Sequence, residues 1–232
     1  MSFVLEEVTS AADFDAIWPV HFQAFRNPYN AFSKFFNPVH TTLDSAIETS
    51  KARHVVMWKS SCTTHWIKVT DTGTGQVVGA ACWDIMENGY SKDQAETFRK
   101  NVKATQHIEG SEEKKWAEKL IGGLRSAVME RTNGPHVELK QMVVHPEYRG
   151  KGIARMLTGW GTNIADERSI PTIVVAVPYA RPVYEKLGFE CIHEIAIDFT
   201  APNPSEKWKE WEAEDMRAFL MVRPSSEAPS RT

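Results

Sequence analysis

The residue types best suited to chemistry lie in one window, where a predicted strand runs into a glycine-rich turn and then a helix. The strand is predicted to end at Val144, Pro146 interrupts further pairing, and apolar residues at helical spacing begin at Ile153. The turn between them contains two basic residues and two glycines: Arg149, Gly150, Lys151 and Gly152. Helix N-termini present free N–H groups and the positive end of the helix dipole, and glycines allow close backbone approach. The window therefore predicts a phosphate or pyrophosphate site.

The turn does not fit the two best-known phosphate-binding sequence patterns. Its spacing is neither that of the P-loop nor that of the three-glycine dinucleotide fingerprint, so a purely structural turn is the alternative. About thirty residues later, the sequence ARPVYEKLGFE predicts a short helix that carries Tyr184. Pro182 suits the first turn of that helix and Gly188 suits its left-handed end.

These two motifs resemble those of the GCN5-related N-acetyltransferases, the GNAT superfamily. Arg149-x-x-Gly152-x-Ala154 matches the signature R/Q-x-x-G-x-G/A, and Tyr184-x-Lys186-x-Gly188 resembles the tyrosine-containing helix of the superfamily. The resemblance extends from residue 137 to 199 and, less closely, over 66–84, and it is closest in appearance to fungal members of uncertain substrate.

The resemblance implies an α/β fold in which a central mixed β-sheet, flanked by helices, splays apart at a cleft that holds acetyl-CoA as co-substrate. Its pantetheine arm would bind the strand edge, and its pyrophosphate would bind the helix N-terminus. The coenzyme-binding residues implied in this way are Met142, Val143, Val144, Arg149, Gly150, Lys151, Gly152, Ile153, Ala154 and Tyr184. One departure is Val177, which stands where many relatives have an asparagine that contacts the pantetheine arm.

Two residues match catalytic positions of the superfamily. Tyr184 would be the general acid that protonates the departing thiolate, the alternative being a tyrosine of the core. Glu138 lies eleven residues before Arg149, where histone-acetylating members have their catalytic glutamate, and would be the base. A mid-strand glutamate faces either the cleft or a solvent-exposed sheet face. His136 and His145 are rival bases.

The remaining elements must position these residues. Strands are predicted at 3–8, 66–71, 77–84, 137–144, 172–177, 189–199 and 218–222, and helices at about 10–25, after 42, at 91–104, 111–132, from 153 and at 181–188. The glycines of TGTG, residues 72–75, predict a tight hairpin, and Gly122 and Gly123 are expected to weaken the helix 111–132. Asp84 and Trp83, at the hairpin's end, could reach the acceptor.

We expect one N-acetyltransferase domain over residues 1–222, with a helical insertion at about 87–134 and a flexible tail at 223–232. The insertion is either a solvated cover or a substrate-selecting lid. The acceptor pocket is expected to come from this segment and from the aromatic loop 27–38.

Composition limits the classes of function. The net charge of −3 argues against nucleic acid as a partner, and no stretch predicts a membrane span or an export signal, which favours the cytoplasm. Cys62, Cys82 and Cys191 are widely spaced, so neither a metal site nor a disulfide framework is indicated. The sequence predicts direct transfer of acetyl from acetyl-CoA to a primary amine, with a small-molecule acceptor and a chain that could form a homodimer. A coenzyme A-binding sensor without turnover, or an acyltransferase with another acyl donor, is the alternative.

Overall fold

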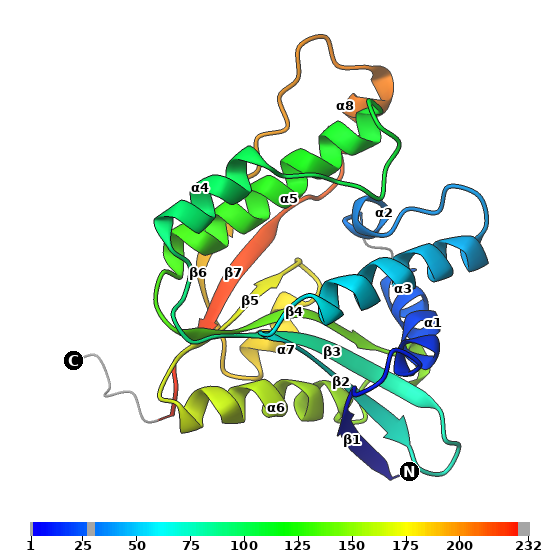
Figure 1. Ribbon diagram of the computed structural model, residues 1–232, viewed down its shortest axis with the longest axis vertical. Helices are drawn as coiled ribbons and strands as arrows, with labels where there is room; N and C mark the ends of the chain where they lie inside the picture. The colour runs from blue at the N-terminus through cyan, green and yellow to red at the C-terminus, as the bar shows by residue number, and fades with distance from the viewer. Residues whose placement is uncertain (1, 27–30, 227–232) are drawn as a thin grey trace.

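The computed structural model describes residues 2–26 and 31–226, which form one seven-stranded mixed sheet covered by helices on both faces (Figure 1). In spatial order the strands are β1 (Phe3–Glu7), β2 (Thr64–Asp71), β3 (Val77–Met86), β4 (His136–Val144), β5 (Thr172–Ala176), β7 (Ala218–Arg223) and β6 (Glu190–Ile195). Only β4 and β5 pair in parallel; all other neighbours are antiparallel. The predicted fold class is confirmed.

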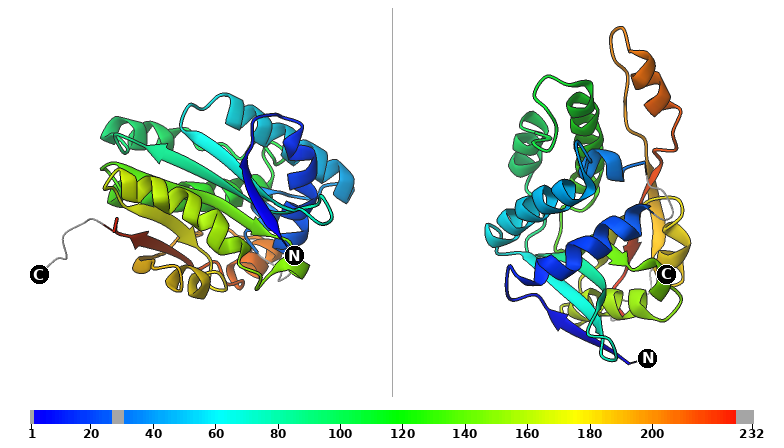
Figure 2. Two further views of the ribbon diagram at one scale, coloured as in Figure 1. Left: turned by 90° about the horizontal axis from the view of Figure 1, so that it is seen from below. Right: turned by 90° about the vertical axis from the view of Figure 1, so that its right-hand side faces the viewer.

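Helices divide between the two faces of the sheet (Figure 2). One face carries α6 (Ile153–Glu167) and the short α7 (Arg181–Glu185). The other carries α1 (Asp13–Arg26), α2 (Ser33–Phe36), α3 (Leu43–Lys59), α5 (Glu112–Arg131) and α8 (Glu206–Glu212), with α4 (Lys92–Lys100) packed against α5. Side chains alternate between the faces along each strand, so that Val174 and Met221 pack toward α6 while Ile173 and Leu220 pack toward α5.

The sheet opens between β4 and β5, and this opening positions the site. Their parallel pairing joins only Val137–Leu139 to Thr172–Val174, whereas β3 pairs with β4 along its whole length. Lys140 has no partner in the β3 register, because Cys82 faces Gln141 and Trp83 faces Leu139. An extra residue of this kind bends a strand. The bend at Lys140 coincides with the point where β4 leaves β5.

Several local predictions are confirmed by hydrogen bonds at helix starts. The Thr42 hydroxyl accepts a hydrogen bond from the backbone N–H of Ser45 and begins α3. Ser111 does the same for Lys114 at the start of α5. Before α1 the Asp13 carboxylate accepts hydrogen bonds from the N–H groups of Thr9 and Ser10, and the Ser10 hydroxyl accepts one from the N–H of Ala12.

The predicted hairpin is confirmed, since β2 and β3 pair antiparallel across the TGTG turn, although only Gly75 there has a positive φ, of 71°. The expected weakening of helix α5 at Gly122 and Gly123 is wrong. The helix is unbroken, and a Cβ at Gly123 would lie 3.0 Å from Ile197, so glycine lets the chains approach there. The Pro- and Trp-rich stretch 201–215, for which no helix or strand was predicted, contains α8, whose Trp208 and Trp211 are buried.

The first residues of the predicted tail, from Arg223 to Ser226, contact the rest of the protein. Arg223 is the last residue of β7 and binds the Asp166 carboxylate with both guanidinium nitrogens, at 2.8 and 2.9 Å. The N–H of Ser226 donates to the same carboxylate. Residues 227–232 of the predicted tail lie outside the described residues. Within the described ranges, no helix has the length and apolar character that crossing a bilayer requires.

The helical segment 87–134 is part of the core rather than a solvated cover. Trp116, Leu120 and Leu124 of α5 are buried against the face formed by β5, β7 and β6. Arg125 of the same helix contacts β4 through an ion pair described below.

Candidate active site

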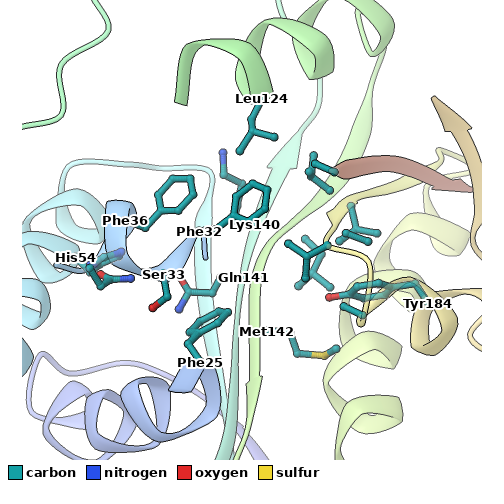
Figure 3. A pocket seen from close by; sticks show the side chains of 18 of the residues that line it. Phe25, Phe32, Ser33, Phe36, His54, Leu124, Lys140, Gln141, Met142 and Tyr184 are labelled. Atoms are coloured by element: carbon teal, nitrogen blue, oxygen red, sulfur yellow. The ribbon is translucent and has the colours of Figure 1, made fainter. Parts of the chain in front are cut away.

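A cavity of about 230 Å³, open to solvent, lies where β4 and β5 diverge (Figure 3). One side of it is formed by β4, β5 and α7, with Met142, Val174, Val175, Ala176, Val177, Ala180 and Tyr184. Its other side is formed by α1, α2, α3, α5 and the bend of β4, with Phe25, Phe32, Ser33, Phe36, Asn37, Arg53, His54, Leu124, Lys140 and Gln141.

The predicted phosphate turn has the backbone that its glycines imply. Gly150 and Gly152 adopt φ values of 77° and 87°, and Gly152 is the N-cap of α6. A Cβ built on either glycine would have no atom within 4 Å, so the space in front of both is open. Ile153 and Ala154 follow as the first residues of the 15-residue helix, whose first N–H groups have no acceptor within the helix and no side-chain cap from Gly152. The turn therefore fits an anionic group such as a pyrophosphate.

The two basic side chains of the turn have partners within the protein. Arg149 Nη2 donates to the backbone carbonyl of Ala24 at 2.9 Å, which ties the turn to the last turn of α1. The Lys151 ammonium lies 4.4 Å from the centre of the Tyr148 ring. Both residues are exposed, and both keep N–H donors for a further anion.

The edge of β4 beyond Leu139 is the expected place for the pantetheine arm. Residues 141–144 pair with β3 on one side, and β5 has diverged from them on the other. Met142 lines the cavity, whereas the Val143 side chain is buried toward α1 and Val144 packs toward α6. Binding here would use the backbone of Val143 and Val144 rather than their side chains, as in strand addition.

Tyr184 lies at the end of the cavity that β5 and α7 form. Its side chain is buried, packs edge-on against Phe189, and points its hydroxyl into the cavity (Figure 3). Burial, together with the neighbouring Tyr179, raises the pKa of the Tyr184 phenol. The phenol is therefore protonated at neutral pH. Val177 lines the same end, so an apolar side chain occupies the position that is a polar contact in many relatives.

Glu138 faces neither the cavity nor solvent. It is 3% exposed, it accepts hydrogen bonds from Arg125 Nη1 at 2.5 Å and from the Tyr90 hydroxyl at 2.8 Å, and Lys140 Nζ lies at 3.7 Å. Burial alone would raise the pKa of its carboxyl, but the charges of Lys140 and Arg125 and these hydrogen bonds hold the pKa at about 2. The solvent-exposed alternative is thus wrong, and such a carboxylate is a poor proton acceptor.

The rival bases also lie outside the cavity lining. His136 is buried against Tyr90 with Nδ1 2.8 Å from the Gly134 carbonyl. His145 Nδ1 accepts a hydrogen bond from the N–H of Glu147 in the turn. The Asp84 carboxylate accepts a hydrogen bond from Thr64, and Trp83 is fully buried under α6. Trp83 is therefore a core residue and does not reach the acceptor.

The other side of the cavity comes partly from the two segments that we expected to form an acceptor pocket, and partly from residues that the sequence analysis did not single out. Phe32, Ser33, Phe36 and Leu124 belong to the predicted loop and helical segment. Residues 27–30 of that loop lie outside the described residues.

Sequence reasoning missed Arg53 and His54 of α3, which no motif marks. His54 Nδ1 donates to the carbonyl of Ser50 at 2.8 Å, and burial lowers the pKa of its imidazole to about 4. His54 is therefore neutral at neutral pH. It lies on the opposite side of the cavity from Tyr184 (Figure 3).

Comparison with known proteins agrees with this geometry. Residues 86–198 match the family described as "Acetyltransferase (GNAT) domain", and this match includes the helical segment 87–134. No curated protein is detectably similar in sequence.

Solved acetyltransferase structures share the fold. The "histone acetyltransferase HPA2 and related acetyltransferase" of Corynebacterium glutamicum superposes with a TM-score of 0.59 at 18% identity, covering 100% of both chains. Arylalkylamine N-acetyltransferase 2 of Aedes aegypti gives 0.60 at 14% identity, covering 97% of this chain and 99% of that one. A GNAT superfamily phosphinothricin acetyltransferase of Sinorhizobium meliloti, in complex with AcCoA, gives 0.54 at 16% identity, covering 100% and 93%. At these identities the likeness establishes the fold.

Proposed function

We propose that this chain, a member of the GNAT superfamily, is an N-acetyltransferase that moves an acetyl group from acetyl-CoA directly to a primary amine of a small molecule. One observation carries the proposal. The open turn at Gly150 and Gly152 and the cavity before Tyr184 lie along the same diverging strand, β4. A long ligand with an anionic part and a reactive end fits this arrangement. The acetyl-CoA complex of the phosphinothricin acetyltransferase supports the same choice of co-substrate.

The residues that would hold the coenzyme lie at the open glycine turn and along the unpaired edge of β4. The backbone N–H groups around Gly150, Gly152 and Ala154 would bind the pyrophosphate, with Lys151 and Arg149 adding charge. The free edge of β4 would bind the pantetheine arm. Acetyl-CoA supplies an acetyl group activated as a thioester.

Tyr184 is proposed as the general acid. In the transfer a bond forms between the amine nitrogen and the acyl carbon as the carbon–sulfur bond breaks. The nitrogen loses one proton, and the departing thiolate gains one from the Tyr184 hydroxyl. Burial keeps this phenol protonated and aimed into the cavity, so it is ready to donate. A thiolate in a poorly hydrated cleft gains most from such a donor.

The proton of the amine is proposed to leave to water. The Glu138 carboxylate is occupied by Arg125 and Tyr90, and no Asp or Glu of the described residues lines the cavity. Arg53 and Lys140 line it instead and disfavour an ammonium ion. The amine therefore binds in its neutral form, which is the form that attacks.

A coenzyme A-release screen tests the function. Acetyl-CoA is offered with panels of polyamines, amino acids, amino sugars, arylamines, arylalkylamines and aminoglycosides, and thiol release is followed. Saturable release with at least one amine, and acetylated product by mass spectrometry, supports the proposal. Tight coenzyme binding by calorimetry without release from any panel would indicate a coenzyme-binding sensor instead.

A different acyl donor is the second candidate, favoured by the apolar Val177 in the cavity wall. Replacing acetyl-CoA by propionyl-, butyryl- and malonyl-CoA in the same screen separates the two. A higher kcat/KM for one of these donors would change the acyl group and leave the mechanism intact.

A further inference from the structure

Arg53 is a cation on the cavity wall with no carboxylate to balance it. Its Nη2 donates to the Phe36 carbonyl at 2.7 Å and to Asn37 Oδ1 at 3.0 Å, both of which are neutral acceptors. Among residues 2–26 and 31–226, no Asp or Glu oxygen lies within 4.0 Å of its guanidinium. Arg53 is partly buried, and a guanidinium has five N–H donors, so donors remain for another partner.

The second cation of the wall differs in this respect. Lys140 Nζ lies 3.5 Å from the Asp84 carboxylate and 3.7 Å from that of Glu138, so its charge is compensated within the protein. Removing charge from water is costly unless a counter-charge is near. Of the two, Arg53 is the one that would gain from an anionic ligand.

Large apolar side chains stand among the polar ones in the cavity wall. Phe25 of α1, Phe32 at the N-cap of α2, Phe36 of α2 and Leu124 of α5 converge toward the same space (Figure 3). Aromatic walls of this kind favour a flat or bulky apolar body in the ligand. Phe36, whose carbonyl accepts the hydrogen bond from Arg53, lies on the side of the cavity opposite Tyr184 (Figure 3).

We propose that the acceptor is an amine with an aromatic or bulky apolar body and an anionic group, such as a carboxylate, at the end opposite the amine, and that Arg53 binds the anionic group. The inference rests on the proposed function, because that function makes the amine the reacting group of the ligand. With the anion at Arg53 and the apolar body against Phe32 and Phe36, the amine reaches the Tyr184 end of the cavity.

The first experiment uses the natural chain and matched acceptors. Benzylamines that carry a para carboxylate on spacers of increasing length are compared with their primary amides, which have the same shape but no charge. The carboxylate with the best-fitting spacer is expected to exceed its amide in kcat/KM by about 10- to 100-fold, the effect of one charge-assisted contact. Equal kcat/KM for every acid and amide pair would overturn the proposal.

Variants identify the residue. Arg53→Gln is expected to bring the ratio of kcat/KM for the carboxylate to kcat/KM for its amide close to one, and Arg53→Lys to retain part of the preference for the carboxylate. Arg99→Gln, which removes an exposed arginine paired with Glu130 far from the cavity, is the matched control and keeps the full preference. A full preference in a folded Arg53→Gln chain would overturn the assignment. If that variant does not fold, Arg53→Lys and the acid–amide comparison still decide the proposal.

Binding without chemistry separates this inference from the proposed function. The para-alkyl benzoate that lacks an amine is titrated into the natural chain and the Arg53 variants by calorimetry. Binding that depends on Arg53, without turnover of any amine, supports the anion site and contradicts the transferase. Acetylation of amines without any preference for carboxylates supports the transferase and contradicts the anion site.

Discussion

Arg125 of α5 and Glu138 of β4 form a buried ion pair in which Nη1 lies 2.5 Å from Oε1. The Tyr90 hydroxyl closes the group, since it donates to Glu138 Oε2 at 2.8 Å and accepts from Arg125 Nη2 at 2.5 Å. Two of the three residues come from the helical segment 87–134. This segment is therefore bound to the strand whose divergence forms the cavity, and the carboxylate that resembles a catalytic base serves to hold it there.

We expect Glu138→Gln to destabilise the protein more than it impairs turnover. Removing one partner of a buried ion pair leaves the Arg125 charge uncompensated and costs about 3–5 kcal/mol. Urea unfolding measures this loss, and the kcat of the folded variant is expected to change by less than about tenfold. As a general base, Glu138 would instead lower kcat by roughly 10² to 10⁴ when replaced. That loss in a stably folded variant would restore its catalytic role.

A double variant is the control for this prediction. Replacing both charges, as Arg125→Met with Glu138→Leu, removes the unpaired buried ion and is expected to recover much of the stability lost in the single variant. Additive losses in the double variant would show that the two side chains do not act as a pair.

Tyr184→Phe is expected to bind acetyl-CoA nearly normally and to lose turnover by roughly 10² or more, since only the proton-donating hydroxyl is removed. The alkaline descending limb of the rate profile, which a titrating phenol produces, should disappear as well. The control is Tyr179→Phe, which alters an exposed tyrosine just upstream. Unchanged kcat with an intact alkaline limb would make Tyr184 a core residue only.

Gly152→Val is expected to abolish acetyl-CoA binding, measured by calorimetry, because its side chain would fill the open space in front of the helix N-terminus. The substitution also strains a backbone with φ of 87°, at a cost on the order of 1–3 kcal/mol. Gly110→Val controls for strain, since Gly110 has φ of 78° and equally open surroundings outside the cavity lining. Near-normal coenzyme affinity in folded Gly152→Val would make the turn merely structural.

The buried His21 is expected to make the fold sensitive to acid. Burial, followed by the charges of His54 and Arg53, lowers the pKa of His21 to about 3 from 6.5. Below pH 6.5 the His21 imidazole of the unfolded chain becomes protonated, whereas that of the folded chain stays neutral down to about pH 3. The free energy of unfolding therefore falls as the pH falls from 6.5 to 3. The loss from this group reaches ~2 kcal/mol at pH 5.

His21→Phe tests the source of this sensitivity. The ring stacks on Trp18 with centroids 5.2 Å apart, and phenylalanine keeps an aromatic ring there without a titrating group. Urea unfolding at pH 7 and pH 5 is expected to show a smaller difference in the variant than in the natural chain. The same difference in both would assign the acid sensitivity to other groups, such as His54.

The sequence was enough to predict the turn and the two helices on one side of the cavity. The turn at Gly150 and Gly152, the helix that follows it, and the short helix with Tyr184 are each encoded within a few consecutive residues. Glycines that need positive φ, a proline at a helix start and apolar residues at helical spacing act locally, so their effects can be predicted without knowledge of distant contacts.

The acceptor side and the state of Glu138 were decided only by the tertiary structure. Glu138 meets Tyr90 and Arg125 across 48 and 13 residues of sequence, and a strand pattern does not specify which charge will face a given carboxylate. Arg53 lines the cavity because α3 packs beside α1 over the bend of β4. The partners of a charged side chain and the walls of a cavity depend on which helices and strands pack together. Long-range packing decides this, so it cannot be predicted from the spacing of residues within one segment.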